Sequence, residues 1–328
     1  MAPTRVEIDR ILCPVDFSEF SAPAVERAVR LGKWFGGRVE VLHVVPFVVP
    51  TGLPDFPVPL EVTRAQREQA AQGLADLAAP FRGEVPLETK LLEGDPWRII
   101  REEAKAFSAD LLVMGTHGRS GFEYLLLGSV TEKLVRRAPC PVLTVGQVPA
   151  HPGGGAPFRR ILCAADLTHA SERTLDVALS LASENDGRIT LLHVVESLPG
   201  ETAGRLYLAV PEIGPLRRDL MEQARTQLRK AVPDTARDFC NVSERVEVGA
   251  AWSEILRVAE ETDADLIVMG AHARGALGRM FFGSTASQVV RRATCPVLIV
   301  QEKKAERPSR EAAETVGATA DRPKGGGR

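Results

Sequence analysis

The chain has 328 residues, of which 44% are hydrophobic and 26% charged, and these values are typical of a globular protein with about two domains. The 41 lysines and arginines nearly balance the 43 aspartates and glutamates, so no overall basic field favours a nucleic acid as partner. No apolar run approaches the ~20 residues of a membrane span, and the N-terminus lacks the apolar core of a signal peptide, so we expect a cytoplasmic protein with no membrane partner.

Strands and helices alternate along the first half of the chain. From about Ser21 the apolar residues recur at helical spacing, and Gly36 and Gly37 end that helix, whereas Asp95 and Pro96 have the residue types that open one. The predicted elements, in order, are a strand at 11–15, a helix at 21–35, a strand at 39–45, an irregular proline-rich connection at 46–59, a helix at 61–79, a strand at 87–92, a helix from 96, a strand at 110–114, a helix at 129–137 and a strand at 142–145. This alternation implies a parallel sheet with helices on both faces.

An internal repeat covers nearly the whole chain. The repeated segments are RILCPVD at 10–16 and RILCAAD at 160–166, LHVV at 42–45 and 192–195, ADLLVMG at 109–115 and ADLIVMG at 264–270, and RRAPCPVL at 136–143 and RRATCPVL at 291–298. We therefore predict two copies of one α/β domain, at 1–147 and 158–303, with the same order of elements. Prolines and glycines predict a linker at 148–157, and residues 304–328, with almost no apolar side chains, predict a disordered tail.

The cysteines give no sign of a covalent or metal framework. Cys13, Cys140, Cys163, Cys240 and Cys295 are odd in number, form no Cys-x-x-Cys pair and do not lie beside histidines at ligand spacing. We therefore expect neither disulfides nor a zinc site, and no protein residues are assigned as metal ligands. Most of them border apolar runs, which is typical of small buried side chains.

A glycine-bearing segment between the fourth strand and the next helix is the most distinctive stretch of the first half. Gly115 and Gly118 allow another group to approach the backbone closely, and Ser129 with Glu132 has the pattern of a capping box at the helix start. The N–H groups in the first turn of such a helix form a natural seat for a phosphate. Glycines are also ordinary turn residues, and Ser129 would cap its helix without any ligand. The residues alone therefore leave a phosphate site and a plain turn as alternatives.

The sequence of this segment resembles the ATP-binding signature of the universal stress protein family. The resemblance rests on the spacing of three glycines. Two residues separate Gly115 from Gly118, and nine separate Gly118 from Gly128, which Ser129 follows directly. Arg119 lies beside the second glycine. The sequence CPVL after the following helix agrees with it. The resemblance extends over roughly residues 8–147 and 158–301.

The resemblance also implies a particular fold. Each copy is expected to be a doubly wound parallel sheet of five strands in the order 3-2-1-4-5, as in the adenine-nucleotide α-hydrolase-like fold. Ligands of open α/β sheets bind at the carboxyl ends of the strands, where the strand order reverses. In this order the reversal lies between strands one and four, so Asp16 and the segment 115–129 are expected to meet there.

In the first half, the resemblance implies a pocket for ATP with magnesium. Asp16 would lie at its nucleoside end, although an aspartate after a strand also commonly caps the next helix. Val44 would meet adenine through its backbone and Met114 would touch the base, although both residue types are also ordinary core residues. His43 and His193 are expected to be structural. The predicted site residues are Asp16, Val44, Met114, Gly115, His117, Gly118, Arg119, Gly128, Ser129, Val130 and Thr131.

The phosphate end of this pocket would be formed by the loop and the helix start. His117 and Arg119 would meet phosphate oxygens, although an exposed loop arginine is often only solvated. Ser129 and Val130 would offer backbone N–H groups, and the Ser129 hydroxyl would bind phosphate or its magnesium. Thr131 is a weaker candidate for the same role.

The second half departs from the pattern. Ala273 stands where the second glycine is expected, and a methyl group there would cost on the order of 1 kcal/mol or more if the position needs φ > 0 or bare backbone. Ser287 replaces the glutamate of the capping box. The weaker candidates that remain are Asp166, Val194, Gly270, Arg274, Gly283 and Ser284. We therefore predict that the first half binds ATP well and that the second half binds it weakly or not at all.

No catalytic motif is present. The sequence has no His-Glu-x-x-His, no Gly-x-Ser-x-Gly and no P-loop lysine, so we predict binding with at most weak hydrolysis and assign no catalytic residue. The resemblance implies an ATP-binding regulatory module in a cytoplasmic stress response. Two alternatives remain: a slow ATPase or phosphotransferase that uses the same pocket, and an interaction scaffold that binds no nucleotide.

The resemblance further implies how the two copies would associate. In the family, the last strands of two domains pair across a two-fold axis, and the matching segments here are 142–145 and 297–300. Both are apolar strand edges that need a partner. The chain is therefore expected to pair its own two domains, with a homodimer of chains as a further possibility.

Overall fold

The computed structural model describes the following residues: 7–46, 60–116, 127–146, 158–184, 186–196, 213–271 and 283–301. The predicted linker at 148–157 and the predicted tail at 304–328 lie outside the described residues. So do residues 117–126, which include most of the predicted phosphate loop.

The first half contains five strands that alternate with helices, as the sequence predicts. In order, the elements are β1 (Arg10–Val15), α1 (Ser21–Phe35), β2 (Arg38–Val45), α2 (Leu60–Ala78), the one-turn 3₁₀ helix η1 (Ala79–Phe81), β3 (Leu87–Glu93), α3 (Pro96–Ala106), β4 (Leu111–Gly115), α4 (Ser129–Arg137) and β5 (Val142–Val145). Gly36 ends α1 in the left-handed region, with φ of 71°. A Cβ on Gly37 would lie 2.6 Å from the Ile8 carbonyl oxygen, so the turn into β2 requires this glycine.

The second half repeats this order. Its elements are β6 (Arg160–Ala164), α5 (His169–Ser183), β7 (Arg188–Glu196), α6 (Ile213–Ala231), α7 (Asp234–Arg237), β8 (Asn241–Gly249), α8 (Ala251–Glu261), β9 (Leu266–Gly270), α9 (Ser284–Arg292) and β10 (Val297–Val300). Within the described ranges, none of the helices combines the length and apolar character needed to cross a membrane.

The ten strands of the described residues belong to one sheet in the order β3-β2-β1-β4-β5-β10-β9-β6-β7-β8. Within each half the strands are parallel and follow the order 3-2-1-4-5, which confirms the predicted fold. At the centre, β5 and β10 run antiparallel, with Leu143 opposite Leu298. The chain therefore pairs its own two last strands, as the resemblance implied.

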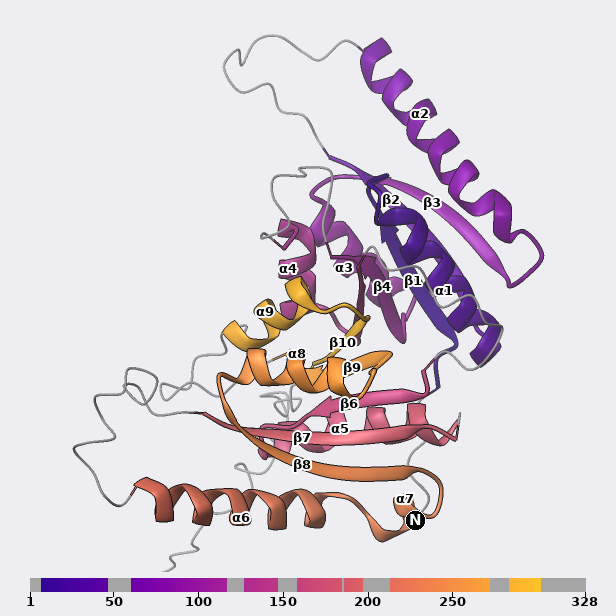
Figure 1. Cartoon of the computed structure of the whole chain (residues 1–328). Helices are drawn as coiled ribbons and strands as arrows, with labels where there is room; N and C mark the ends of the chain where they lie inside the picture. The colour runs from indigo at the N-terminus through magenta and orange to yellow at the C-terminus, as the bar shows by residue number, and fades with distance from the viewer. Residues whose placement is uncertain are drawn as a thin grey trace, which may run out of the picture.

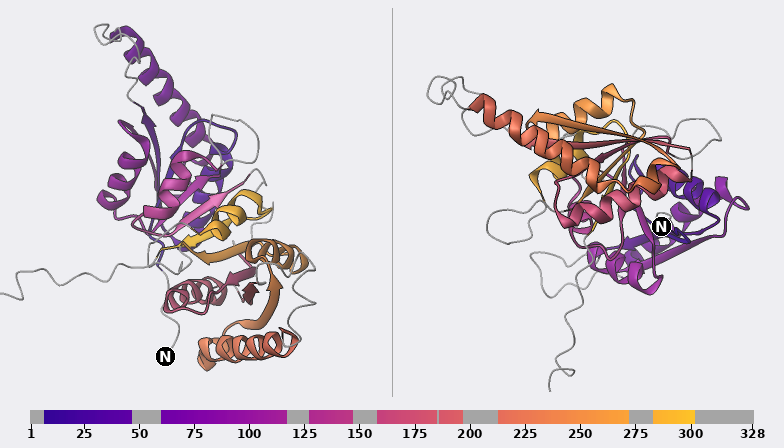
Figure 2. Two further views of the ribbon diagram at one scale, coloured as in Figure 1. Left: turned by 90° about the vertical axis from the view of Figure 1, so that its left-hand side faces the viewer. Right: turned by 90° about the horizontal axis from the view of Figure 1, so that it is seen from below.

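Helices cover both faces of this sheet, so the molecule has three layers (Figure 1, Figure 2). One apolar cluster lies under α1, α2, α5 and α6, and a second lies under α3, α4, α8 and α9. Because these central strands are buried on both faces, β1, β4 and β10 are nearly continuous apolar runs. α2 and α6 pack beside the outermost strands β3 and β8 at the two ends of the sheet (Figure 1).

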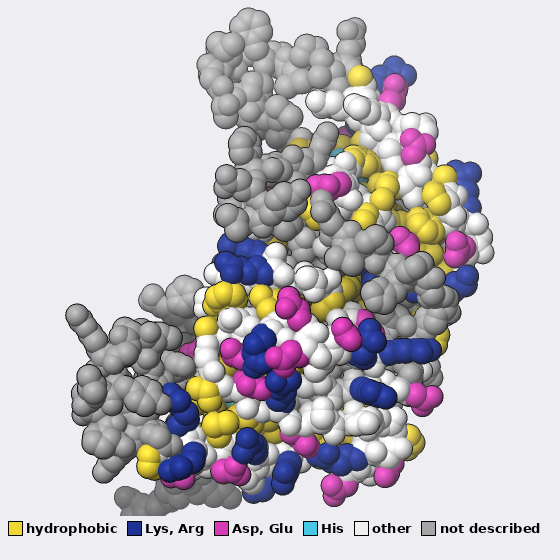
Figure 3. All heavy atoms as spheres, viewed as in Figure 1, with side chains coloured by type: hydrophobic (Ala, Val, Ile, Leu, Met, Phe, Trp, Pro, Cys, Tyr) yellow, Lys and Arg dark blue, Asp and Glu magenta, His cyan; other side chains and the backbone are white. Residues whose placement is uncertain are grey.

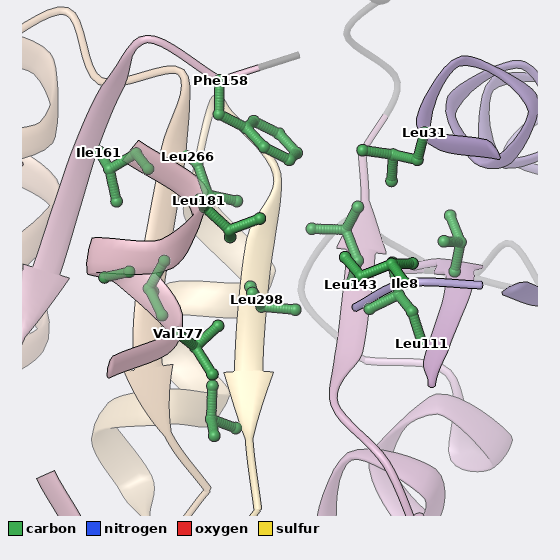
Figure 4. Close-up of a cluster of buried hydrophobic side chains, with 14 of the residues drawn as sticks. Ile8, Leu31, Leu111, Leu143, Phe158, Ile161, Val177, Leu181, Leu266 and Leu298 are labelled. Carbon is green, nitrogen blue, oxygen red and sulfur yellow. The ribbon is translucent and has the colours of Figure 1, made fainter. Parts of the chain in front are cut away.

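Apolar side chains from both halves fill the junction at the centre of the sheet. Figure 4 shows apolar side chains of the second half on one side and of the first half on the other. Leu298 on β10 and Leu143 on β5 face each other where the two groups meet. Ile8 and Phe158, from opposite halves, line the same small void of about 20 Å³. The Thr144 hydroxyl also donates a hydrogen bond across the junction to the Val297 carbonyl oxygen, at 3.1 Å. Each of the two apolar clusters therefore continues from one half into the other.

Candidate functional site

The carboxyl ends of β1 and β4 lie side by side at one edge of the sheet. The two strands are parallel neighbours, with Ile11 opposite Leu111 and Leu12 opposite Leu112. β2 flanks β1 on one side and β5 flanks β4 on the other, so the strand order reverses between β1 and β4. Asp16 directly follows β1 and Thr116 directly follows β4, at the position where open α/β sheets bind their ligands.

The carboxylate of Asp16 is held by the turn that follows β1. Its Oδ1 accepts hydrogen bonds from the Ser18 backbone N–H at 3.0 Å and from the Ser21 hydroxyl at 3.2 Å. The turn places Phe17 in the left-handed region, with φ of 60°. The N-cap of α1 is Phe20, without a side-chain cap, so Asp16 does not cap the helix as the alternative interpretation held. Its carboxylate is instead oriented within a tight turn at the edge of the sheet.

The wall beside Asp16 comes from β2 and β4. His43 is only 8% exposed, and its Nδ1 lies 2.7 Å from the Val15 carbonyl oxygen. Because a carbonyl oxygen can only accept a hydrogen bond, Nδ1 is the donor. This histidine therefore ties β2 to the end of β1, as expected of a structural histidine. Val44 and Met114 lie in one apolar cluster with Ile100 of α3. An apolar wall and an oriented carboxylate thus occur at the same edge.

The first turn of α4 is fastened to the end of β4. The Gly128 N–H donates to the Thr116 carbonyl oxygen at 3.1 Å, and the Thr131 hydroxyl donates to the Gly115 carbonyl oxygen at 3.0 Å. Ser129 is the first helical residue, and it is exposed. The start of this helix therefore has a fixed position beside β4.

The predicted capping box at α4 is wrong. Gly128, not Ser129, is the N-cap residue, and no side chain caps the helix. The Gly128 carbonyl oxygen already accepts the first helical hydrogen bond, from the Glu132 N–H at 2.9 Å, so Ser129 lies one position too far along to act as a cap. Since the first N–H groups of a helix have no partner within it, those of Ser129 and Val130 are left for another acceptor such as an anion.

Several predicted contacts fall outside the described residues. These are His117, Gly118 and Arg119 in the first half, and Arg274, together with the substituted Ala273, in the second. Their part in a site stays a prediction. The described residues of the first half that gather at the carboxyl edge are Asp16, Val44, Met114, Gly115, Gly128, Ser129, Val130 and Thr131.

The equivalent edge of the second half holds a cavity of about 300 Å³. This volume is at the lower end of the range for small-molecule sites. Asp166 lies in its wall, and its Oδ1 accepts hydrogen bonds from the Thr168 N–H at 3.0 Å and hydroxyl at 2.6 Å. His193 repeats the contact of its counterpart, with Nδ1 2.8 Å from the Ala165 carbonyl oxygen. The lining residues are Ala164, Ala165, Asp166, Thr168, Thr174, Leu192, His193, Val194, Glu196, Ala251, Ile255, Met269, Gly270, Gly283, Thr285 and Ala286.

Four of the weaker candidates, Asp166, Val194, Gly270 and Gly283, line this cavity, whereas Ser284 is exposed and does not. Gly270 is informative because a Cβ there would meet only the Thr174 hydroxyl oxygen, at 3.7 Å, which is an ordinary contact. Packing within the described protein therefore does not explain this glycine. A ligand close to the backbone would explain it.

The sequence did not predict four polar residues in the cavity wall, Thr168, Thr174, Glu196 and Thr285. Thr285 could have been predicted from the repeat. Alignment of the two copies places it opposite Val130, a predicted site residue in the first turn of the last helix. Thr174 and Glu196 align with an alanine and a proline of the first half, so the repeat gave no signal for them.

Comparisons with known proteins decide the family. Residues 7–146 and 157–301 each match the model described as the Universal stress protein family, and together these ranges span most of the chain. The chain belongs to the universal stress protein family. It is a tandem member, with two copies of the fold.

Relatives of this family align either with most of the chain or with less than half of it. A universal stress protein of Mycolicibacterium smegmatis is 28% identical over 301 residues, which cover 89% of this chain and 97% of that protein. A universal stress protein of Methanocaldococcus jannaschii is 35% identical over 139 residues, covering 42% of this chain and 81% of the relative. The crystal structure of a universal stress protein from Archaeoglobus fulgidus is similar with a TM-score of 0.66 at 23% identity, covering 92% of this chain and 99% of that one, which supports the shared fold.

Proposed function

We propose that this universal stress protein binds ATP with magnesium in its first half and acts as a nucleotide-dependent regulatory module of the cytoplasmic stress response. The observation that carries the proposal is the position of Asp16 and of the first turn of α4 at the carboxyl ends of the neighbouring strands β1 and β4, where the strand order reverses. A nucleotide has a polar sugar and an anionic phosphate chain, and this edge supplies a group for each of them.

The roles of the described residues follow from their chemistry. The Asp16 carboxylate accepts hydrogen bonds, so it would bind the hydroxyl groups of ribose. The apolar cluster that includes Val44 and Met114 would cover the base. The N–H groups at the start of α4, beside Ser129, would bind phosphate oxygens, because a helix N-terminus carries partial positive charge. Magnesium would be held together with the phosphates, as it usually is in nucleotide sites.

The first test is to denature freshly purified protein and to identify any released nucleotide by chromatography. Calorimetric titration of nucleotide-free protein with Mg-ATP then measures the affinity. We expect Asp16→Ala to weaken binding at least about tenfold, since it removes a charged acceptor that the ribose would need, a loss of about 1.4 kcal/mol or more.

Asp166→Ala is the matched control, because Asp166 holds the equivalent place in the second half. If the first half is the stronger site, Asp166→Ala leaves the high-affinity transition unchanged. The proposal is wrong if the nucleotide-free protein does not bind Mg-ATP, or if Asp16→Ala binds it as tightly as the wild type. Equal losses of affinity in both variants would contradict only the prediction that the first half binds ATP more tightly than the second.

A further inference from the structure

A tryptophan surrounded by cations lies on α3 and α4, beyond the residues assigned to the nucleotide. The Trp97 ring centroid is 5.8 Å from the guanidinium carbon of Arg98, 5.4 Å from that of Arg101, 5.9 Å from that of Arg137 and 5.8 Å from the Lys133 Nζ. These five residues are called the Trp97 cluster. In Figure 3 a group of Lys and Arg side chains lies at the surface where Figure 1 places α4 and α9. Each of the two helices contributes two of the four cations.

Most of this positive charge has no carboxylate partner within the described part of the chain. Arg98 forms an ion pair with Asp95, at 3.5 Å. The described ion pairs include none to Arg101, Lys133 or Arg137. The Nε of Arg101 is buried and has no hydrogen-bond partner among the described residues. Cations that share one ring repel one another, and a bound anion would relieve that repulsion.

The second half shows that the fold does not need these cations. Trp252 occupies the place of Trp97 there, and among the described residues only Arg292, the counterpart of Arg137, lies over its ring, at 4.5 Å. The other three positions hold residues without charge, namely Ser253, Leu256 and Gln288 in place of Arg98, Arg101 and Lys133. The two helices of the second half pack together with these neutral residues. Packing of the two helices therefore does not require the extra cations of the first half.

We propose that the Trp97 cluster binds an acidic peptide segment of a partner protein. Arginine guanidinium groups bind carboxylates in a bidentate manner, and Trp with Arg is the combination that dominates the binding energy of protein interfaces. A nucleic acid fits less well, because its bases need several open aromatic faces and its backbone needs an extended basic track. Here one indole is crowded by cations, and the whole chain carries a net charge of −2.

The experiment uses the full chain and a short fluorescein-labelled glutamate-rich peptide, with fluorescence anisotropy as the readout. The test variant combines Arg98→Ser, Arg101→Leu and Lys133→Gln, so each new residue is the one that the second half carries at the equivalent position. We expect this variant to bind the peptide at least about tenfold more weakly than the wild type. Added salt should weaken the wild-type complex, because the attraction is partly between exposed charges.

A matched control carries the same change in charge on α6, where three exposed cations lie far along the chain from the cluster. It combines Arg225→Ser, Arg229→Leu and Lys230→Gln. We expect its affinity to stay within about twofold of the wild type, since only long-range charge changes. If the triple cluster variant unfolds at a lower temperature, the single change Lys133→Gln at an exposed position repeats the test and should still weaken binding.

The proposal is overturned by any of three results. The first is that the wild-type chain does not bind the acidic peptide. The second is equal loss of affinity in the cluster variant and in the α6 control, which would indicate general charge attraction. The third is tighter binding of a single-stranded oligonucleotide than of the peptide. None of these results bears on ATP binding, which the Asp16→Ala titration tests separately.

Discussion

At the scale of single residues, burial controls the chemistry of the cysteines. Cys13 and Cys163 have no exposed surface, and all five thiols are free. Burial raises the pKa of Cys163 to about 12 and is also the largest cause of the raised pKa values of Cys140 and Cys295, both about 12. These thiols stay protonated at neutral pH, and a protonated thiol is a poor nucleophile. The residues therefore act as small apolar side chains, as the sequence indicated.

Replacing Cys163 by Ala should make the stability of the chain less sensitive to alkaline pH. An unfolded thiol ionises near about pH 8.5, whereas folded Cys163 keeps its proton to about 12. The folded chain thus binds more protons within this window, so the free energy of unfolding falls as the pH rises through it. Urea denaturation from neutral pH to about pH 10 measures the slope, which should be shallower in Cys163→Ala. Parallel slopes in the two proteins would contradict the assignment.

At the scale of elements, apolar runs and the internal repeat predicted the strands and the longer helices that the structure describes. β1 and β4 were visible in the sequence because strands buried on both faces are continuous apolar segments. The one-turn helices η1 and α7 were missed, since a single turn has no periodicity to detect.

The candidate site was less accessible to sequence reasoning. Asp16 follows β1 and Gly115 ends β4, and the resemblance implied that these two strands are neighbours, so the edge of the sheet where both residues lie could be predicted. Thr174 lines the cavity of the second half because α5 packs against β9. A motif in the linear sequence does not contain that contact. The N-cap of α4 was misassigned because Gly128 and Ser129 are adjacent and both are good N-cap residues.

The bond between Thr131 and the end of β4 gives a prediction about α4. Thr131→Val keeps the size of the side chain but removes the hydroxyl that donates to the Gly115 carbonyl oxygen at 3.0 Å. We expect the free energy of unfolding to fall by about 1 kcal/mol, the usual net value of such a bond. Mg-ATP affinity should fall as well, because the first turn of α4 loses a tie to β4. Thr131→Ser, which retains a hydroxyl, is the control in urea denaturation and calorimetry, and equal behaviour of Val and Ser variants would refute the role of the bond.

At the scale of the whole molecule, the two halves are joined by main-chain pairing and by a shared core. The β5–β10 pairing is supported by the Thr144 hydroxyl and by Gln301, whose side-chain amide donates to the Val135 carbonyl oxygen at 3.1 Å. Phe158, which is 2% exposed, lies at the junction with the Arg27 guanidinium carbon 5.8 Å from its ring centroid. The junction therefore buries polar and apolar groups that either half alone would expose.

This junction predicts that the separated halves will associate. Expressed alone, residues 1–147 would expose the edge of β5, and residues 158–303 would expose the edge of β10. Since a free apolar strand edge recruits another strand, each half should form a dimer with itself, and a mixture should form a one-to-one complex. Sedimentation velocity distinguishes these species, whereas the intact chain provides the reference. Two halves that stay monomeric, alone and when mixed, would show that the pairing depends on the covalent connection.

The central pairing of β5 with β10 has one more consequence. Because both strands belong to a single chain, dilution does not separate them, and the arrangement persists at any protein concentration. In a homodimer, one substitution in the gene changes both subunits. In this chain the two copies are encoded separately, so a substitution changes only one of them. One copy can thus carry Arg98, Arg101 and Lys133 around its tryptophan while the other carries Ser253, Leu256 and Gln288. Two different surfaces are in this way presented at a constant one-to-one ratio.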